Sequence, residues 1–299
     1  MIAVPLCGPM SIAASAPRLT IEAPASLELF AETLRGTDPA PLAEAAALVG
    51  LEDPGPPIRV ILAEETSPAG RQAPSWAEGY AFGSEGVVVL IPGRARAYPY
   101  GSLEALLHHE VAHVLIDRAA RGHPVPRWFH EGVAMAAARR WTVADRGRLV
   151  VEMIPGRRIG PGELDELFRR GEGPARGAYT LSGAFVRDLL RRHGPRLPSR
   201  ILPEVGGGMP FDEAFRRATG ESPSGAADAF YRRENIWSRW VPLLTSTFTV
   251  WTGISLLALW AIRRRRARDA RRKEEWAMEE AVHEAIESGR RWNRKSLDN

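Results

Sequence analysis

Two stretches of the chain decide its expected fold, His109-Glu110-Val111-Ala112-His113 and Trp128-Phe129-His130-Glu131-Gly132-Val133-Ala134. Histidines four residues apart on a helix share one face, about 6 Å apart along the axis, so both imidazoles can reach one zinc ion. Glu110 follows the first histidine and points beside such an ion, where the general base for a water molecule must lie. A catalytic zinc has three protein ligands and one open position, and Glu131 is the best candidate for the third ligand. The sequence therefore predicts one Zn2+ per chain, bound by His109, His113 and Glu131.

The helix that carries both histidines can be predicted from its ends. Ser102 is a good N-cap, because its hydroxyl can accept a hydrogen bond from an N–H group of the first turn. Gly122 ends the helix, and a proline-containing turn leads into a second, alanine-rich helix over residues 128–140. Two antiparallel helices joined in this way would place the two histidines and Glu131 on facing surfaces.

A metal-free interpretation of the same helix pair competes with the zinc site. In that interpretation backbone carbonyls satisfy the histidines and Glu110 faces solvent. Two histidines and two carboxylates within an otherwise apolar helix pair would be costly without a metal ion, which favours zinc. His108, His123 and His130 lie close by in the sequence, and we expect them at the surface or in support of the site rather than as ligands.

Beyond these residues, the sequence resembles a known family. The two motifs, with the later stretches 179–187 and 210–220, resemble the gluzincin zinc metallopeptidases, specifically their compact peptidase-MA-like domains, over about residues 55–236. The resemblance implies peptide hydrolysis, with His109, His113 and Glu131 as zinc ligands and Glu110 as the base. A metzincin is excluded, because its third histidine and its glycine would fall on Ala119 and Ile116, respectively.

One position departs from that resemblance. Thermolysin-like enzymes carry an aspartate four residues after the ligand glutamate, and Met135 stands there. Asp117, one turn beyond His113, is the nearest candidate for a carboxylate that orients a ligand imidazole. Tyr179 stands at a distance from Glu131 where related enzymes carry a tyrosine that steadies the oxyanion, and its hydroxyl could donate to developing negative charge. The alternative for Tyr179 is an aromatic ring that packs against the start of a helix.

The composition and the strand pattern predict the fold class. Of 299 residues, 44% are hydrophobic, which is enough for one sizeable core. Residues 58–63 and 86–91 are rich in Val and Ile and bounded by Pro and Gly. We expect them to be strands of a small sheet whose edge could hold an extended peptide. Downstream of Glu131 the pattern is helical, including a helix over 181–193. The expected class is α+β: a small β-sheet packed on a zincin-type helical domain, followed by a single C-terminal transmembrane helix.

The formal net charge of +4 does not indicate nucleic acid as a partner. Basic residues gather in 263–273, directly after an uncharged stretch, and no recognised nucleic-acid motif is present. Cys7 is the only cysteine, so an intramolecular disulfide and a cysteine-ligated zinc are both excluded. The expected partners are a peptide or protein substrate and membrane lipid, with no nucleic acid.

The uncharged stretch at residues 241–262 is long enough to cross a hydrocarbon core of about 30 Å as a helix. Trp240 and Trp260 suit the two interfaces, and the arginines that follow favour a cytoplasmic tail with the catalytic domain outside a cell membrane. The alternative is a buried core helix. Residues 1–16 are apolar and end in Ala-Ser-Ala, which indicates a signal peptide without a basic start. The alternative there is that upstream residues are missing.

These features predict a membrane-anchored zinc-dependent peptidase. Its expected parts are a signal peptide (1–16), an N-terminal segment and linker (17–57), a zinc metallopeptidase-like domain (58–238), a transmembrane helix (241–262) and a basic, charged cytoplasmic tail (263–299). Glu110 would take a proton from a water molecule and pass it to the leaving amine. Two alternatives stay open. One is a catalytically silent, zinc-stabilised envelope scaffold that does not need Glu110, and the other is a metal-free helical binding module.

Overall fold

The computed structural model describes residues 14–95, 102–138, 141–153, 157–245, 251–252 and 254–265. The chain divides into two compact units, residues 1–236 and residues 237–299, and the elements described below belong to the first unit unless stated. Most of the expected signal peptide and most of the expected cytoplasmic tail lie outside the described residues.

The sheet has four strands in the order β1-β2-β4-β3. The strands β1 (Leu19–Glu22), β2 (Ile58–Leu62) and β4 (Val87–Leu90) are parallel, and β3 (Gly79–Phe82) pairs antiparallel with β4. The predicted strands 58–63 and 86–91 correspond to β2 and β4, whereas β1 and β3 were not predicted. β1 also shows that the segment 17–57, which was expected to precede the domain, contributes a strand to its sheet.

Helices make up most of the unit. They are α1 (Glu28–Arg35), α2 (Ala40–Val49), α3 (Pro68–Gln72), α4 (Leu103–Ala119), α5 (Arg127–Ala138), α6 (Val143–Met153), α7 (Pro161–Leu167), α8 (Glu172–His193), α9 (Leu197–Gly206) and α10 (Phe211–Thr219), with short 3-10 helices η1 (Ala25–Leu27) and η2 (Gly83–Glu85). The helix α11 (Pro223–Thr245) begins in the first unit and ends in the second.

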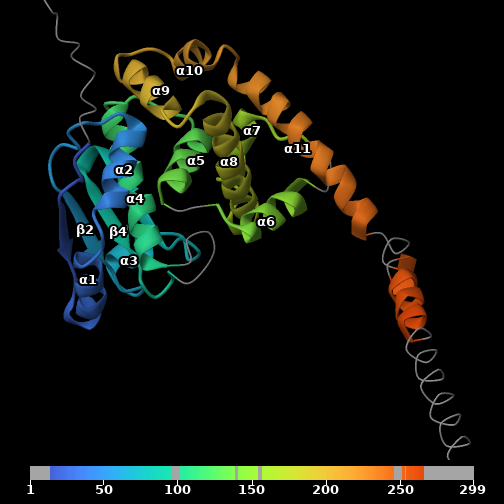
Figure 1. Ribbon diagram of the computed structural model, residues 1–299. Coiled ribbons are helices and arrows are strands. Elements are labelled where there is room, and N and C mark those ends of the chain that lie inside the picture. The colour runs from blue at the N-terminus through green and yellow to red at the C-terminus, as the bar shows by residue number, and fades with distance from the viewer. Residues whose placement is uncertain are drawn as a thin grey trace, which may run out of the picture. The chain divides into compact units, whose positions relative to one another are not determined.

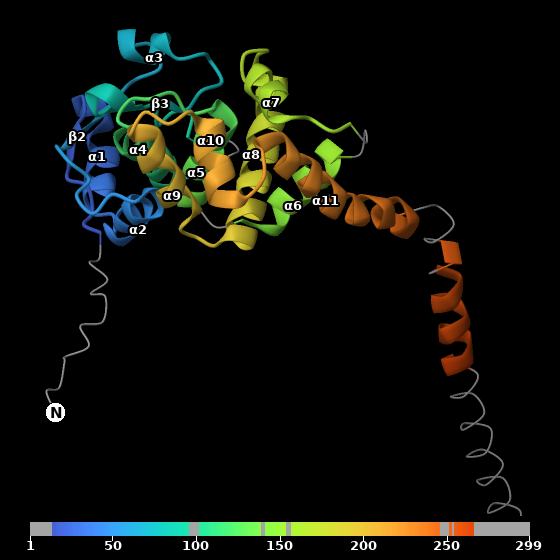
Figure 2. The same ribbon diagram turned by 90° about the horizontal axis from the view of Figure 1, so that it is seen from above.

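The helix α4 lies between the sheet and α5. It contacts β3, β4 and η2 on one side and α5 on the other, and Figure 1 and Figure 2 show the sheet, α4, α5 and α8 following one another in that order. The Ser102 side chain caps α4 by accepting a hydrogen bond of 3.1 Å from the Ala105 N–H group. The chain reverses after α4 through Arg121 and Gly122, which both have positive φ angles.

The helix α5 packs closely against α8 because residue 132 is glycine. A Cβ atom placed on Gly132 would lie 2.4 Å from Cγ2 of Val186 and 2.6 Å from the carbonyl oxygen of Ser182, both on α8. Any larger residue would therefore push the two helices apart. Aromatic rings anchor the start of α5, since Trp128 stacks on Phe185 with a centroid distance of 4.8 Å, and Phe129 lies 5.1 Å from Phe211.

The predicted fold class was wrong. The chain is mostly helical, at 64%, with a small sheet. Among the residues that the structure describes, no helix combines the length and the apolar character that a membrane span requires. Residues 241–245 form the end of α11, and within the expected span residues 246–250 and 253 lie outside the description. Among the described residues, α11 carries charged side chains such as Arg232, Arg233 and Glu234 ahead of residues 241–245, and the helical stretch 254–265 is short and ends in three arginines.

Candidate metal centre

Three side chains from two helices meet in one small triangle. His109 and His113 lie on consecutive turns of α4, and Glu131 lies on α5, which faces it. The two histidine Nε2 atoms are 3.0 Å apart, and Oε2 of Glu131 is 3.3 Å from Nε2 of His109 and 3.4 Å from Nε2 of His113. Tetrahedral zinc with bonds of about 2.05 Å holds neighbouring ligand atoms about 3.3 Å apart. The triangle therefore has the size of a zinc site.

The donor set and its burial also fit zinc. Two imidazole nitrogens with one carboxylate oxygen are a typical ligand set for a catalytic zinc ion. Oε2 of Glu131 is buried and makes no hydrogen bond within the described part of the chain, although two imidazole nitrogens lie within 3.4 Å of it. A buried carboxylate oxygen without a hydrogen bond is costly. A cation bound inside the triangle would offset the cost of burying this oxygen of Glu131.

The protonation states suit metal ligands. Burial lowers the pKa of His113, which favours the neutral imidazole that a ligand requires. Burial raises the pKa of Glu131, but contacts with His113 and His109 outweigh it and hold that pKa well below its ordinary value. The other oxygen of Glu131, Oε1, lies 3.4 Å from Nε of Arg127, one turn earlier on α5. Arg127 thus holds one carboxylate oxygen while the other faces the histidines.

The start of α5, which positions Glu131, is fixed from a neighbouring helix. The Trp128 N–H group donates a hydrogen bond of 2.7 Å to Oδ1 of Asp165 on α7. A carboxylate at a helix N-terminus satisfies a free N–H group and interacts favourably with the helix dipole. Asp165 and the aromatic core around Trp128 therefore determine where Glu131 meets α4.

Glu110 lies beside the triangle and under the edge of the sheet. It is only 4% exposed, and a Cβ atom placed on Gly79 would lie 3.3 Å from Cγ of Glu110, so the backbone of β3 passes directly over this side chain. Burial, followed by the negative charges of Glu131 and Glu78, raises the pKa of Glu110 well above its ordinary value. Glu110 consequently holds a proton more readily than Glu131 does.

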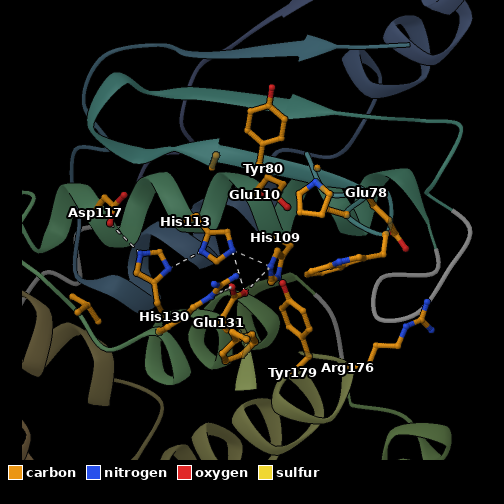
Figure 3. A pocket seen from close by; sticks show the side chains of 18 residues that line it. Glu78, Tyr80, His109, Glu110, His113, Asp117, His130, Glu131, Arg176 and Tyr179 are labelled. Carbon is orange, nitrogen blue, oxygen red and sulfur yellow. Dashed lines mark hydrogen bonds and ion pairs between the residues drawn. The ribbon is translucent and has the colours of Figure 1, made fainter. Parts of the chain in front are cut away.

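A cavity of about 470 Å3 connects these groups. The triangle, Glu110 and the edge strand β3 all line it, together with Tyr179 and Arg127. Figure 3 shows Tyr179 pointing from α8 toward His109 and Glu131. Its ring packs edge-on against Phe168 at a centroid distance of 5.0 Å. Tyr179 lies within α8 rather than at the start of a helix, and it both packs against an aromatic neighbour and presents its hydroxyl to the cavity.

The Tyr179 hydroxyl is suited to donate a hydrogen bond. Burial and the negative charge of Glu131 raise its pKa well above the ordinary value, and the charge of Glu110 adds to this, against an opposing effect of Arg127. The hydroxyl therefore remains protonated across the physiological pH range. A protonated donor in a buried cavity can stabilise negative charge that develops on a substrate.

Asp117, the expected orienting carboxylate, reaches the triangle through another residue. Its Oδ1 atom lies 3.0 Å from Nε2 of His130, and Nδ1 of His130 lies 2.7 Å from Nδ1 of His113. The structure thus places His130 between the carboxylate and the ligand (Figure 3). The other two neighbouring histidines are elsewhere: His123 is exposed, and His108 is buried at the wall of a different cavity.

Three charged residues of this cavity were not predicted from the sequence: Arg127, Arg176 and Glu78. Arg127 stands four residues before Glu131. On a helix this spacing brings two side chains together, so the contact could have been predicted from the sequence. Glu78 is 4% exposed and lines the cavity just before β3. Because β3 itself was not predicted, no pattern in the sequence points to Glu78.

Comparison of the sequence with models of protein families and with curated proteins gave no match.

Proposed function

We propose that this protein is a zinc-dependent peptidase that uses Glu110 as its general base. One observation carries the proposal: the buried triangle of His109, His113 and Glu131, with edges of 3.0 to 3.4 Å, has Glu110 next to it on the same helix. The resemblance of the two motifs to gluzincin metallopeptidases supports the same assignment. A zinc-stabilised scaffold needs the triangle but not the buried Glu110, and a metal-free module needs neither.

Each residue has a distinct part in the proposed reaction. His109 and His113 would hold the zinc ion through Nε2, and Glu131 through Oε2. Zinc, when bound, polarises a carbonyl group and lowers the pKa of a coordinated water. Glu110 accepts a proton from the attacking water and passes it to the nitrogen of the leaving amine. The raised pKa of Glu110 suits the protonated form that donates to the leaving amine. A nearby dication favours the ionised form of Glu110 that first accepts the proton from water.

The cavity also offers places for the substrate. β3 is an outer strand of the sheet and lines the cavity through Gly79, Tyr80 and Ala81. The backbone of such a strand can bind an extended peptide by strand addition, which would lay a peptide bond over Glu110. From the opposite wall, the Tyr179 hydroxyl would donate to the carbonyl oxygen as negative charge develops on it.

Glu110→Gln in the full chain tests the proposal. The amide has nearly the same shape but cannot accept the water proton, so we expect unchanged zinc content and a loss of turnover of about 10²–10⁴-fold. Glu104→Gln is a matched control, because Glu104 lies on the first turn of the same helix, is exposed and is absent from the lining of the cavity. Elemental analysis measures zinc, and cleavage of a quenched fluorescent peptide library measures turnover.

Three results would contradict the proposal in different ways. A parent protein that binds no zinc under any loading condition would favour the metal-free module. A parent that binds one zinc ion but cleaves no peptide of the library would favour the scaffold. Cleavage that is equal in the parent and in Glu110→Gln would remove Glu110 from the role of base.

A further inference from the structure

Three side chains form a continuous line that ends at the metal centre. Asp117 and His113 lie one turn apart on α4, and His130 reaches between them from α5. The contacts are 3.0 Å from Oδ1 of Asp117 to Nε2 of His130, and 2.7 Å from Nδ1 of His130 to Nδ1 of His113. The two imidazole planes are inclined by 21°. His113 then turns its remaining nitrogen, Nε2, into the ligand triangle.

The direction of hydrogen bonding along this line is decided at Asp117. An ionised carboxylate only accepts hydrogen bonds, so Nε2 of His130 must carry the hydrogen atom that it donates to Asp117. A neutral imidazole has a single N–H group, which leaves Nδ1 of His130 as an acceptor. Nδ1 of His113 must therefore donate to it, and Nε2 of His113 keeps a free lone pair. The reverse arrangement would turn a lone pair of His130 toward the carboxylate.

We propose that Asp117 and His130 are positioning residues that set the tautomer of His113, so that its Nε2 lone pair faces the metal ion. The inference rests on the proposed zinc site and adds how one of its ligands is prepared. In this inference two residues together orient the imidazole of His113. Asp117 acts on His113 only through the imidazole of His130, which lies between them. Outer partners of this kind commonly change metal affinity by about 10–100-fold when they are removed.

Neighbouring residues restrict the movement of these three side chains. A Cβ atom placed on Gly83 of η2 would lie 1.6 Å from Oδ2 of Asp117, so the turn before β4 packs directly against the carboxylate and leaves it no room to swing that way. The His130 side chain is 18% exposed and that of His113 is 15% exposed. Water therefore has limited access to replace the imidazole–imidazole contact.

Zinc affinity measured by competition with a chelator is the first test, in the full chain. We expect His130→Phe and Asp117→Ala each to weaken zinc binding by about 10-fold or more. Asp117→Asn keeps an oxygen that accepts from His130, so its affinity should stay nearer to that of the parent. The double variant should bind no more weakly than His130→Phe alone, because Asp117 acts through His130. His123→Phe, which replaces an exposed histidine, is the control and should match the parent.

The tautomer itself gives a second measurement that a general loss of stability would not produce. Long-range proton–nitrogen NMR of the protein labelled with 15N-histidine should show His113 protonated at Nδ1, both with zinc and without it, and should show this state lost in the zinc-free Asp117→Ala variant. If His130→Phe fails to fold, Asp117→Ala carries both measurements.

Three outcomes would overturn the inference. They are parent-like zinc affinity in both single variants, a parent His113 protonated at Nε2, and zinc bound to a nitrogen of His130. Absence of zinc binding by the parent would instead contradict the proposed function. In that case the zinc-free NMR measurement still decides whether Asp117 and His130 set the tautomer.

Discussion

Replacing Gly132 with alanine would test whether the close packing of α5 on α8 holds the proposed metal ligands in place. The added Cβ atom would lie 2.6 Å from the carbonyl oxygen of Ser182 and 2.4 Å from Cγ2 of Val186, whereas ordinary van der Waals contact begins at 3.4 Å. The valine can rotate, but the backbone oxygen cannot, so the helices must separate by several tenths of an ångström. Glu131 is the neighbouring residue, and its carboxylate would move with α5 away from the histidines of α4.

The magnitude follows from two opposing effects. Overpacking of a core contact costs about 1–3 kcal/mol, and replacing a helical glycine with alanine stabilises a helix by up to about 1 kcal/mol. We therefore expect Gly132→Ala to lower the free energy of unfolding by about 1–2 kcal/mol. Displacement of Glu131 should also weaken zinc binding by about 10-fold, as for other changes that disturb the placement of a ligand.

Urea unfolding and chelator competition on the full chain would measure both effects, with Gly147→Ala as the control. Gly147 is also helical, on α6, but a Cβ atom there has no neighbour within 4 Å. Gly147→Ala should therefore stabilise the protein by about 0.5–1 kcal/mol without changing zinc affinity. The reasoning fails if Gly132→Ala is as stable as Gly147→Ala, or if it binds zinc as tightly as the parent.

Three further predictions concern single side chains. Glu131→Ala should weaken zinc binding by about 10-fold or more, because the site loses its only anionic ligand; retention of one zinc per chain under competing chelator would remove Glu131 from the ligand set. Tyr179→Phe should lower kcat by about 10-fold or more with little change in KM, because the hydroxyl acts on charge that develops in the transition state; an unchanged kcat would leave only the packing role. Asp188→Asn should lower the free energy of unfolding by about 3 kcal/mol, because its buried carboxylate pairs with three arginines of α8 and α11. Burial raises the pKa of Asp188, but hydrogen bonds from Arg233 and Arg191 outweigh this and lower it. Its stabilisation is thus present above an unfolded pKa of about 3.9 and is lost as the pH falls through the lower folded value. Unfolding curves with the same acid dependence in parent and variant would contradict this.

The parts of the fold that the sequence predicted well are those in which local signals agree. Ser102 caps α4 as expected, and the helix interior is apolar enough to be buried on nearly every side. β1 and β3 were missed because each has four residues, none of which is fully buried. Such strands form because β2 and β4 pair with them, which is a tertiary effect. α8 begins at Glu172, well before the predicted 181, because packing against α5 and α7 outweighs the weak helix propensity of its glycine-rich start.

The candidate site divides in the same way between local and tertiary information. The spacing of His109, Glu110 and His113 follows from helix geometry alone, so their shared face could be predicted without a fold. The connection from Asp117 to His113 could not, because it depends on where α5 crosses α4 and brings His130 between the two side chains. For the same reason the sequence suggested an orienting carboxylate but not the imidazole through which it reaches His113.

The electrostatics of the cavity suit two neighbouring carboxyl groups to different parts in the proposed reaction. Glu110 and Glu131 are both almost fully buried, yet the pKa of Glu110 is raised well above its ordinary value by burial and by nearby carboxylates, while contacts with the histidines overcome burial and lower that of Glu131. When the surroundings shift the pKa values of two carboxyl groups in opposite directions, one group can carry a proton while the other stays ionised. Glu131 is thereby suited to remain a ligand and Glu110 to accept and return a proton, and an exchange of the two roles would require Glu131 to leave its histidines.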